Sequence, residues 1–317
     1  MNNIVKDTVE KFIEIIEKIN PEDFNAGFSL SNKNFVSKRK YNGFNQIYLS
    51  MIRAHFKYPS CDWLTFNQVN KLNGSVKSGE KSSVVLFSGI TYTFISKSGE
   101  RIYANDEDSV EFTKRGEAIV NSVLCSVSSA YSYRIHRVFN VAQTTGIDLT
   151  IDEYNDGKLV IDNQEIVNDI YRYILINNIT IKDTTSSCHY NPKMDSIAIP
   201  PMPVFRHQDK FLEALIHEAI HSTGIESRLN RYNAKEISNN SQEYAVEECI
   251  AEIGSMMFLN ERGIFSSDLN MAAYLKYWVN RDKEFIMSHI FEIVSQAQKA
   301  VNLINKASNN RADTNGC

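Results

Sequence analysis

Residues 217–221 read His-Glu-Ala-Ile-His, and their types and spacing are suited to holding a metal ion. Two histidines four positions apart lie one turn above each other on a helix, so both imidazoles can reach the same ion. Glu218 follows the first histidine and points beside the ion, toward a bound water. In this pattern the histidines are zinc ligands and the glutamate is a general base. We therefore predict that His217 and His221 bind Zn²⁺ and that Glu218 activates a water.

A catalytic zinc ion needs a third protein ligand, and residues 243–258 offer the best choices. The longer pattern HExxHxxGxxH is not completed, because position 227 is a serine. Glu248 and Glu252 lie four apart on a helix that is otherwise largely apolar, where a carboxylate needs a partner. The segment resembles the glutamate-ligand helix of gluzincin peptidases. That resemblance implies that Glu248 is the ligand and that Glu252 orients one imidazole. Glu247 is the main rival for the ligand position.

Peptide hydrolysis also needs a donor that stabilises the tetrahedral oxyanion. Tyr274, Arg228 and His289 carry suitable groups in the second half of the chain. Their positions in the sequence do not choose among them.

The elements that must position these side chains are mainly helices. The stretch from Phe211 to Gly224 has apolar residues all along one broad face, which predicts an inner helix that Gly224 ends. A helix near 164–177 and a short strand before the prolines at 200–201 precede it. From 208 onward the pattern is almost entirely helical, with its largest interruption at 228–242. This half predicts a mostly helical domain with a small sheet.

The first half mixes helices and strands. Apolar periodicity predicts helices over 4–19 and 44–56, and a short helix over 63–74 ended by Asn73-Gly74. Segments rich in β-branched and aromatic residues predict strands over 82–96 and 131–143. A polar, turn-rich stretch at 148–163 predicts the junction between a domain at 1–150 and one at 151–317. The fold class is therefore α+β, with an N-terminal α/β domain followed by the helical domain.

A basic segment lies within a chain whose net charge is −4. Residues 33–81 hold nine Lys and Arg against two Asp and Glu, a balance of +7 (9 − 2). A solvated lysine-rich face explains such a segment, and so does a surface for a polyanion. Single-stranded nucleic acid binds basic grooves whose aromatic side chains stack on bases. Aromatic residues at helical spacing more often belong to a core, so the loop SVKSGEKSS at 75–83 is the stronger choice. The predicted DNA-binding set is Lys38, Arg39, Lys40, Tyr41, Asn45, Trp63, Lys71, Lys77 and Lys81.

Composition excludes two other classes of protein. The five cysteines are odd in number and scattered, which argues against a disulfide framework and against a cysteine zinc knuckle. The sequence has no run of about 18 apolar residues, so it predicts no membrane span. The first twenty residues have an amphipathic pattern rather than that of a signal peptide. We therefore expect a cytoplasmic protein without a membrane partner.

Over nearly its whole length the chain resembles the ArdC-type antirestriction proteins of plasmids and phages. The N-terminal likeness lies in YNGFNQIYL (41–49), WLTFNQVNKLNGSVKSGEKSSVVLF (63–87) and RVFNVAQTTGI (137–147). The C-terminal likeness lies in YNPKMDSIAIPP (190–201), LIHEAIHSTGIESRLNR (215–231), EYAVEECIAEIGSMMF (243–258) and AQKAVNLI (297–304). The resemblance implies an N-terminal domain that binds single-stranded DNA and a C-terminal zinc metallopeptidase domain. In that domain His217, His221 and Glu248 hold the zinc ion and Glu218 is the catalytic acid and base.

Three functions stay open at this point. The first is a zinc peptidase, with an unknown protein or peptide substrate, that its N-terminal domain tethers to single-stranded DNA. The second is a DNA-binding shield whose zinc site is structural or has no physiological substrate. The third is a toxin-like peptidase with one host target. The presence of Glu218 favours retained chemistry, because a purely structural zinc site does not need a base.

Overall fold

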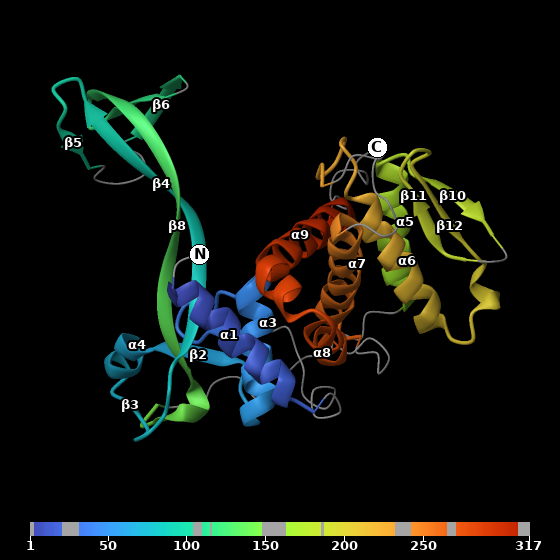
Figure 1. Ribbon diagram of the computed structural model, residues 1–317, viewed down its shortest axis with the longest axis horizontal. Helices are drawn as coiled ribbons and strands as arrows, with labels where there is room; N and C mark the ends of the chain where they lie inside the picture. Colours follow the sequence, from blue (N-terminus) through green and yellow to red (C-terminus); the bar gives the residue numbers. More distant parts are fainter. Residues whose placement is uncertain are drawn as a thin grey trace, which may run out of the picture. The chain divides into compact units, whose positions relative to one another are not determined.

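The chain is described by a computed structural model over residues 3–20, 32–103, 110–114, 116–147, 163–184, 187–231, 242–264 and 271–309 (Figure 1). The predicted domain junction at 148–163 lies almost wholly outside these residues, as does most of the predicted interruption at 228–242. The chain divides into two compact units. One consists of residues 1–81 and 139–317, and the other of residues 82–138.

The first unit begins with two helices whose apolar faces meet. Helix α1 (Asn3–Lys18) buries a stripe of Val5, Val9, Phe12 and Ile16 at helical spacing. Helix α3 (Gly43–Phe56) is buried along most of its length, and the rings of Phe12 and Phe44 meet edge to face with centroids 5.2 Å apart. Both helices confirm the predicted periodicity.

Short strands from both sides of α3 in the sequence form a small β region. Strand β1 (Lys33–Asn34) pairs in parallel with β2 (Asp62–Thr65), and β3 (Ser75–Val76) pairs with β9 (Thr144–Thr145) just after the 3-10 turn η2 (Val141–Gln143). Helix α4 (Phe66–Lys71) starts at a capping box made by Thr65 and Gln68. The predicted helix over 63–74 is therefore shorter, because its first residues form β2. Asn73, at φ 58°, closes it in the left-handed conformation.

The second unit, residues 82–138, is an antiparallel β structure. Strand β4 (Ser83–Ser96) pairs with β8 (Val123–Asn140) from Ser83 opposite Val138 to Ser96 opposite Cys125. Strand β5 (Arg101–Ile102) adds to β4, and β7 (Glu117–Val120) pairs with β6 (Val110–Lys114) and β8. A small core lies among these strands, made by Phe94, Ala118, Val120 and Cys125. The predicted strands are confirmed, and β8 begins eight residues earlier than expected.

The second half of the chain forms a group of helices beside a small sheet. Its strands β10 (Thr180–Asp183), β11 (His189–Asn191) and β12 (Ser196–Ile199) lie in the order β10-β12-β11. The helices are α5 (Asn163–Ile176), α6 (Gln208–Ser222), α7 (Gln242–Glu261), α8 (Met271–Arg281) and α9 (Lys283–Asn309), with a 3-10 turn η3 (Met202–Val204) before α6. Helix α6 contacts β11, β12, α5 and α7, so it lies at the centre of this group.

Helix α6 buries the apolar face that its sequence predicts. Phe211, Leu215, Ile216 and Ile220 are all buried. The helix ends at Ser222, two residues before the predicted Gly224. On α7, Gly254 faces Ile220, and a Cβ at that glycine would lie 3.1 Å from Ile220 Cδ1. The missing side chain therefore lets α6 and α7 approach closely.

The architecture confirms the predicted α+β class, with sheet structure in the N-terminal half and helices beside a small sheet in the C-terminal half (Figure 1). None of the described helices has the length and apolar character needed to cross a membrane. The four described cysteines, Cys61, Cys125, Cys188 and Cys249, are free thiols.

Candidate metal centre

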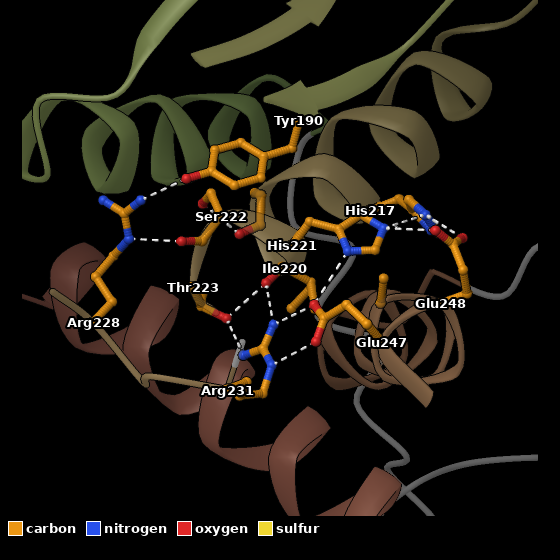
Figure 2. A network of polar contacts seen from close by, with 12 residues as sticks. Tyr190, His217, Ile220, His221, Ser222, Thr223, Arg228, Arg231, Glu247 and Glu248 are labelled. Carbon is orange, nitrogen blue, oxygen red and sulfur yellow. Dashed lines mark hydrogen bonds and ion pairs between the residues drawn. The ribbon is translucent and has the colours of Figure 1, made fainter. Parts of the chain in front are cut away.

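Three side chains from two helices meet at one point. His217 and His221 extend from α6, and Glu248 extends from α7 (Figure 2). One donor atom from each lies within 4.8 Å of the other two. The two Nε2 atoms are 3.1 Å apart, and each lies 3.6 Å from a carboxylate oxygen of Glu248. The structure thus brings together the three residues that the sequence predicted as ligands.

The far nitrogen of each imidazole faces a second acid from α7. His217 Nδ1 lies 3.3 Å from Glu252 Oε2, and His221 Nδ1 lies 3.2 Å from Glu247 Oε1. An acid at Nδ1 fixes the ring orientation and directs Nε2 toward the common point. The sequence predicted this arrangement for Glu252. Glu247, the rival ligand, points at the opposite side of His221 from Glu248.

Arg231 holds Glu247 in place. Its Nε donates to Glu247 Oε2 at 2.9 Å, and its Nη2 donates to Oε1 at 2.7 Å (Figure 2). The same guanidinium donates to Thr223 Oγ1 at 2.6 Å and to the backbone oxygen of Ile220 at 3.0 Å. Both partners of this ion pair are buried, so the two parallel hydrogen bonds work in a medium of low polarity. The sequence analysis did not identify Arg231.

The donor set fits a zinc ion. Two neutral imidazoles and a carboxylate are a common set of three protein ligands at catalytic zinc, which leaves a fourth position open. Zinc bonds of about 2.0–2.1 Å imply separations of roughly 3.3 Å between ligand atoms at tetrahedral angles. The 3.1 Å and 3.6 Å separations here lie close to that value.

Without an ion, the same groups form a network of charges. Burial alone would lower the pKa of His217, but hydrogen bonds to Glu248 and Glu252 and the charge of Glu218 raise it to about 10. Burial raises the pKa of Glu248, but the hydrogen bond to His217 and the charge of His221 outweigh this and lower it to about 2. The metal-free site is therefore an ion pair, in which a proton on His217 occupies the place of a cation.

Glu218 lies beside this group on α6 and is buried. Burial raises the pKa of its carboxyl, while the charges of both histidines and a hydrogen bond from the Tyr190 backbone amide act in the opposite direction. The amide of Tyr190 belongs to β11 and ties the carboxylate to the sheet. Glu218 is thus held close to the three ligands without being one of them.

The three residues considered as oxyanion donors have other partners. Arg228 pairs with Asp195 and donates to Ser222 O at 2.6 Å and Tyr190 Oη at 3.1 Å. Tyr274 Oη donates to Cys249 Sγ at 3.5 Å, and His289 Nδ1 lies 2.9 Å from Phe285 O. In their place the structure offers Tyr244, one turn before Glu248 on α7. Its hydroxyl is hydrogen bonded to Glu248, and burial followed by that bond raises its pKa to about 12.

The predicted DNA-binding residues separate into two groups. Tyr41, Asn45 and Trp63 are buried, and Trp63 Nε1 donates to Asn32 Oδ1 at 2.9 Å. This corrects the sequence prediction, because side chains that form the core around α3 cannot stack on a base. The remaining side chains are exposed: Lys38, Arg39, Lys40, Lys71, Lys77 and Lys81.

Two protein families match the chain. Residues 2–121 match the N-terminal domain of anti-restriction factor ArdC, and residues 169–291 match the zincin-like metallopeptidases. A zincin-like domain takes a divalent metal ion, and the donor set of His217, His221 and Glu248 fits that requirement.

Relatives of known sequence and structure agree with these matches. The uncharacterized protein y4eC of Sinorhizobium fredii is 26% identical over 84% of this chain and 78% of its own length. The DNA primase TraC of Escherichia coli is 25% identical over 84% of this chain, which spans only 17% of that longer protein. Crystal structures of the antirestriction protein ArdC from plasmid R388 are 24% identical to this chain. Their TM-scores are 0.65 for the metal-free form and 0.66 for the Mn(II)-bound form, and the latter covers 97% of this chain and 98% of its own.

The two matched domains together cover most of the chain, and its fold is similar to that of ArdC. The chain is therefore similar to the ArdC-type antirestriction proteins in both of its matched domains.

Proposed function

We propose that this protein is an ArdC-type antirestriction protein, which binds single-stranded DNA through residues 1–150 and carries a zinc-dependent peptidase site in residues 151–317. His217, His221 and Glu248 hold the zinc ion, and Glu218 is the catalytic acid and base. The observation that carries this proposal is the convergence of three donor atoms within 4.8 Å, with each imidazole held at Nδ1 by an acid. A solvated pair of histidines would have no need of such support.

Zinc, when bound, supplies a Lewis acid that polarises a peptide carbonyl and makes water a better nucleophile. Glu218 takes one proton from the attacking water and passes it to the amine of the departing peptide. Burial keeps the pKa of Glu218 above its usual value, which favours proton transfer in both directions near neutral pH. The hydrogen bond from the Tyr190 amide limits the rotation of the carboxylate while it does so.

Tyr244 is the residue that we assign to the oxyanion. Its phenol keeps its proton at neutral pH and is hydrogen bonded to the ligand Glu248, so it lies at the ligand group itself, whereas Arg228, Tyr274 and His289 are bonded to groups that are not ligands. A donor aimed at the developing charge acts in the transition state more than in the ground state.

The neighbouring strand supports a peptide as the substrate. Strand β11 stands at the end of the order β10-β12-β11 and contacts α6. An extended peptide laid along such a strand forms main-chain hydrogen bonds with little dependence on side chains. It would pass the Glu218 carboxylate, which the β11 backbone already touches.

The proposal is tested first by metal content. Protein purified without chelators should hold about one zinc ion per chain, as in other sites with three protein ligands. His217→Ala should lose the zinc ion, whereas Glu218→Gln should keep it because Glu218 is not a ligand. Zinc-free wild-type protein, or His217→Ala that retains zinc, would refute the site.

A second measurement asks what the site does in cells. Glu218→Gln should lose the protection of incoming DNA against restriction while it keeps zinc and DNA binding. Glu226→Gln, the same change at an exposed position five residues beyond His221, is the matched control and should protect as the wild type does. Full protection by Glu218→Gln would assign the antirestriction role to DNA binding alone.

A further inference from the structure

An exposed aromatic pair stands at the end of α3. Phe56 is the last residue of that helix and is 52% exposed. Its ring stacks on Tyr58 with centroids 5.6 Å apart and planes only 17° from parallel. The ring of Tyr58 also meets the buried Trp63 ring edge to face, with centroids 6.3 Å apart. Tyr58 therefore links the exposed Phe56 ring to an aromatic side chain of the core.

The backbone between the two rings adopts an unusual conformation. Lys57 has φ 56° and ψ 38°, the left-handed region that glycine occupies far more readily than lysine. The turn is closed by hydrogen bonds from the Lys57 amide to Ala54 O at 3.3 Å and from the Tyr58 amide to Arg53 O at 2.9 Å. This turn places Phe56 and Tyr58 side by side and leaves Lys57 exposed beside them.

The lysine-bearing loop at 75–83 is hydrogen bonded next to this aromatic pair. Tyr58 is hydrogen bonded to Gln143, whose Nε2 donates to Lys81 O at 3.0 Å and to Glu80 Oε2 at 2.8 Å. The Lys77 amide donates to Gln143 O at 2.9 Å. Gln143 therefore joins the aromatic pair to the loop, and the exposed lysines at 77 and 81 lie on that loop.

We infer that the Phe56–Tyr58 pair is a stacking platform for a base of single-stranded DNA, with Lys57, Lys77 and Lys81 facing the neighbouring phosphates. The Phe56 ring also meets the His55 ring edge to face at 4.7 Å, and about half of its surface stays exposed. A half-exposed aromatic ring suits a base that is not paired, because duplex bases already stack on each other. Three exposed cations around the platform complement a phosphate backbone, and Glu80, whose charge acts on Tyr58, is hydrogen bonded to Gln143. The inference rests on the proposed DNA binding and gives it a location.

Fluorescence anisotropy of the full-length protein with a fluorescein-labelled oligothymidylate of 20 nucleotides tests the platform. Phe56→Ala should weaken binding about tenfold, as expected for the loss of one stacked base. Phe66→Ala is the matched control, since Phe66 is 53% exposed on α4 but does not belong to the stacked pair. It should bind within about twofold of the wild type, because it gives up no base stack. Equal losses in both variants, or no loss in Phe56→Ala, would overturn the platform.

The lysines are tested through the salt dependence. The double variant Lys57→Gln/Lys81→Gln should reduce the slope of log affinity against log salt by about 1.4, roughly 0.7 for each phosphate contact on a single strand. Lys77 stays in place, because its Nζ also donates to Ala142 O at 2.7 Å. Lys299→Gln/Lys306→Gln removes the same charge from exposed positions on α9 and should leave the slope unchanged. An unchanged slope in the first variant would overturn the phosphate contacts.

The possible outcomes distinguish a failure of the stacking platform from a failure of the proposed DNA binding. If the wild type fails to bind the oligothymidylate, the proposed DNA binding is refuted as well. If it binds but Phe56→Ala and the lysine variant bind equally well, the DNA lies elsewhere and only the platform is refuted. Wild-type binding that is no weaker for a duplex of equal length would also refute the platform, because duplex bases cannot reach it.

Discussion

In the metal centre, the two ring nitrogen atoms of each histidine have different partners. Nε2 of each histidine faces Glu248, and Nδ1 faces a separate acid. The two supporting acids are not equivalent. Glu252 keeps some contact with solvent, whereas Glu247 is buried and paired with the buried Arg231. Both acids therefore orient an imidazole, but one does so near solvent and the other in a buried ion pair.

Substitution of the two acids should separate orientation from stability. Glu247→Gln and Glu252→Gln should each weaken zinc affinity about 10- to 100-fold, because each replaces the charged acceptor that orients an imidazole by a neutral amide. Only Glu247→Gln should also lower the unfolding temperature strongly, since it leaves Arg231 buried with no carboxylate, a loss of about 3–5 kcal/mol in comparable pairs. Competition with a zinc-binding dye and thermal unfolding of the chelated protein measure the two effects. Unchanged zinc affinity in Glu247→Gln would show that Glu247 does not orient His221.

The sequence could predict the three side chains that converge and one supporting acid, Glu252, but not the supporting role of Glu247. Glu248 and Glu252 follow from helical spacing and from the cost of a carboxylate within an apolar helix. The role of Glu247 depends on Arg231, which lies in the turn after α6. The two side chains come into contact only in the folded chain. Trp63 shows the opposite failure. Its type suggested a base platform, but only the fold reveals that the ring is buried and that Phe56 is exposed.

At the scale of elements, helical periodicity was the most reliable signal. The apolar stripes of α1, α3 and α6 repeat at the helical period because each helix buries one face, and all three helices lie where that pattern predicts. The start of β8 was missed, since residues 123–130 read Val-Leu-Cys-Ser-Val-Ser-Ser-Ala and include few of the β-branched and aromatic side chains that mark strands. The division of the chain into these two units could not be predicted from the sequence either. Residues 82–138 form a unit between two stretches that fold together, and such pairing of distant segments leaves no local pattern.

The site depends on how closely α6 and α7 pack, because each helix supplies part of the ligand set. Gly254 permits this approach opposite Ile220. Gly254→Val should separate the helices, destabilise the protein by about 1–3 kcal/mol through overpacking, and weaken zinc binding. Adding Ile220→Ala should restore part of the zinc affinity by making room for the new side chain. A Gly254→Val protein that is destabilised but binds zinc as the wild type does would show that this spacing does not control the site.

At the scale of the whole molecule, metal binding and folding should be linked. The ligands come from helices that meet only in the native state, so an ion that binds there stabilises the fold by mass action. Free zinc at about 100 times its dissociation constant should add about 2.7 kcal/mol. For a chain of this size each kcal/mol raises the unfolding temperature by about 2–4 °C, so chelation should lower it by roughly 5–10 °C.

The difference between the zinc-loaded and chelated proteins should grow with pH. In the chelated protein the pKa of His217 is raised from 6.5 to about 10, so its ion pairs contribute stability that is fully present below pH 6.5 and lost as the pH rises through 10. Zinc requires the neutral imidazole, so its apparent affinity increases over the same range as the proton becomes easier to displace. Thermal unfolding at several pH values between 6.5 and 9, with zinc and with chelator, measures both trends. A constant difference across that range would show that His217 carries no proton in the metal-free site.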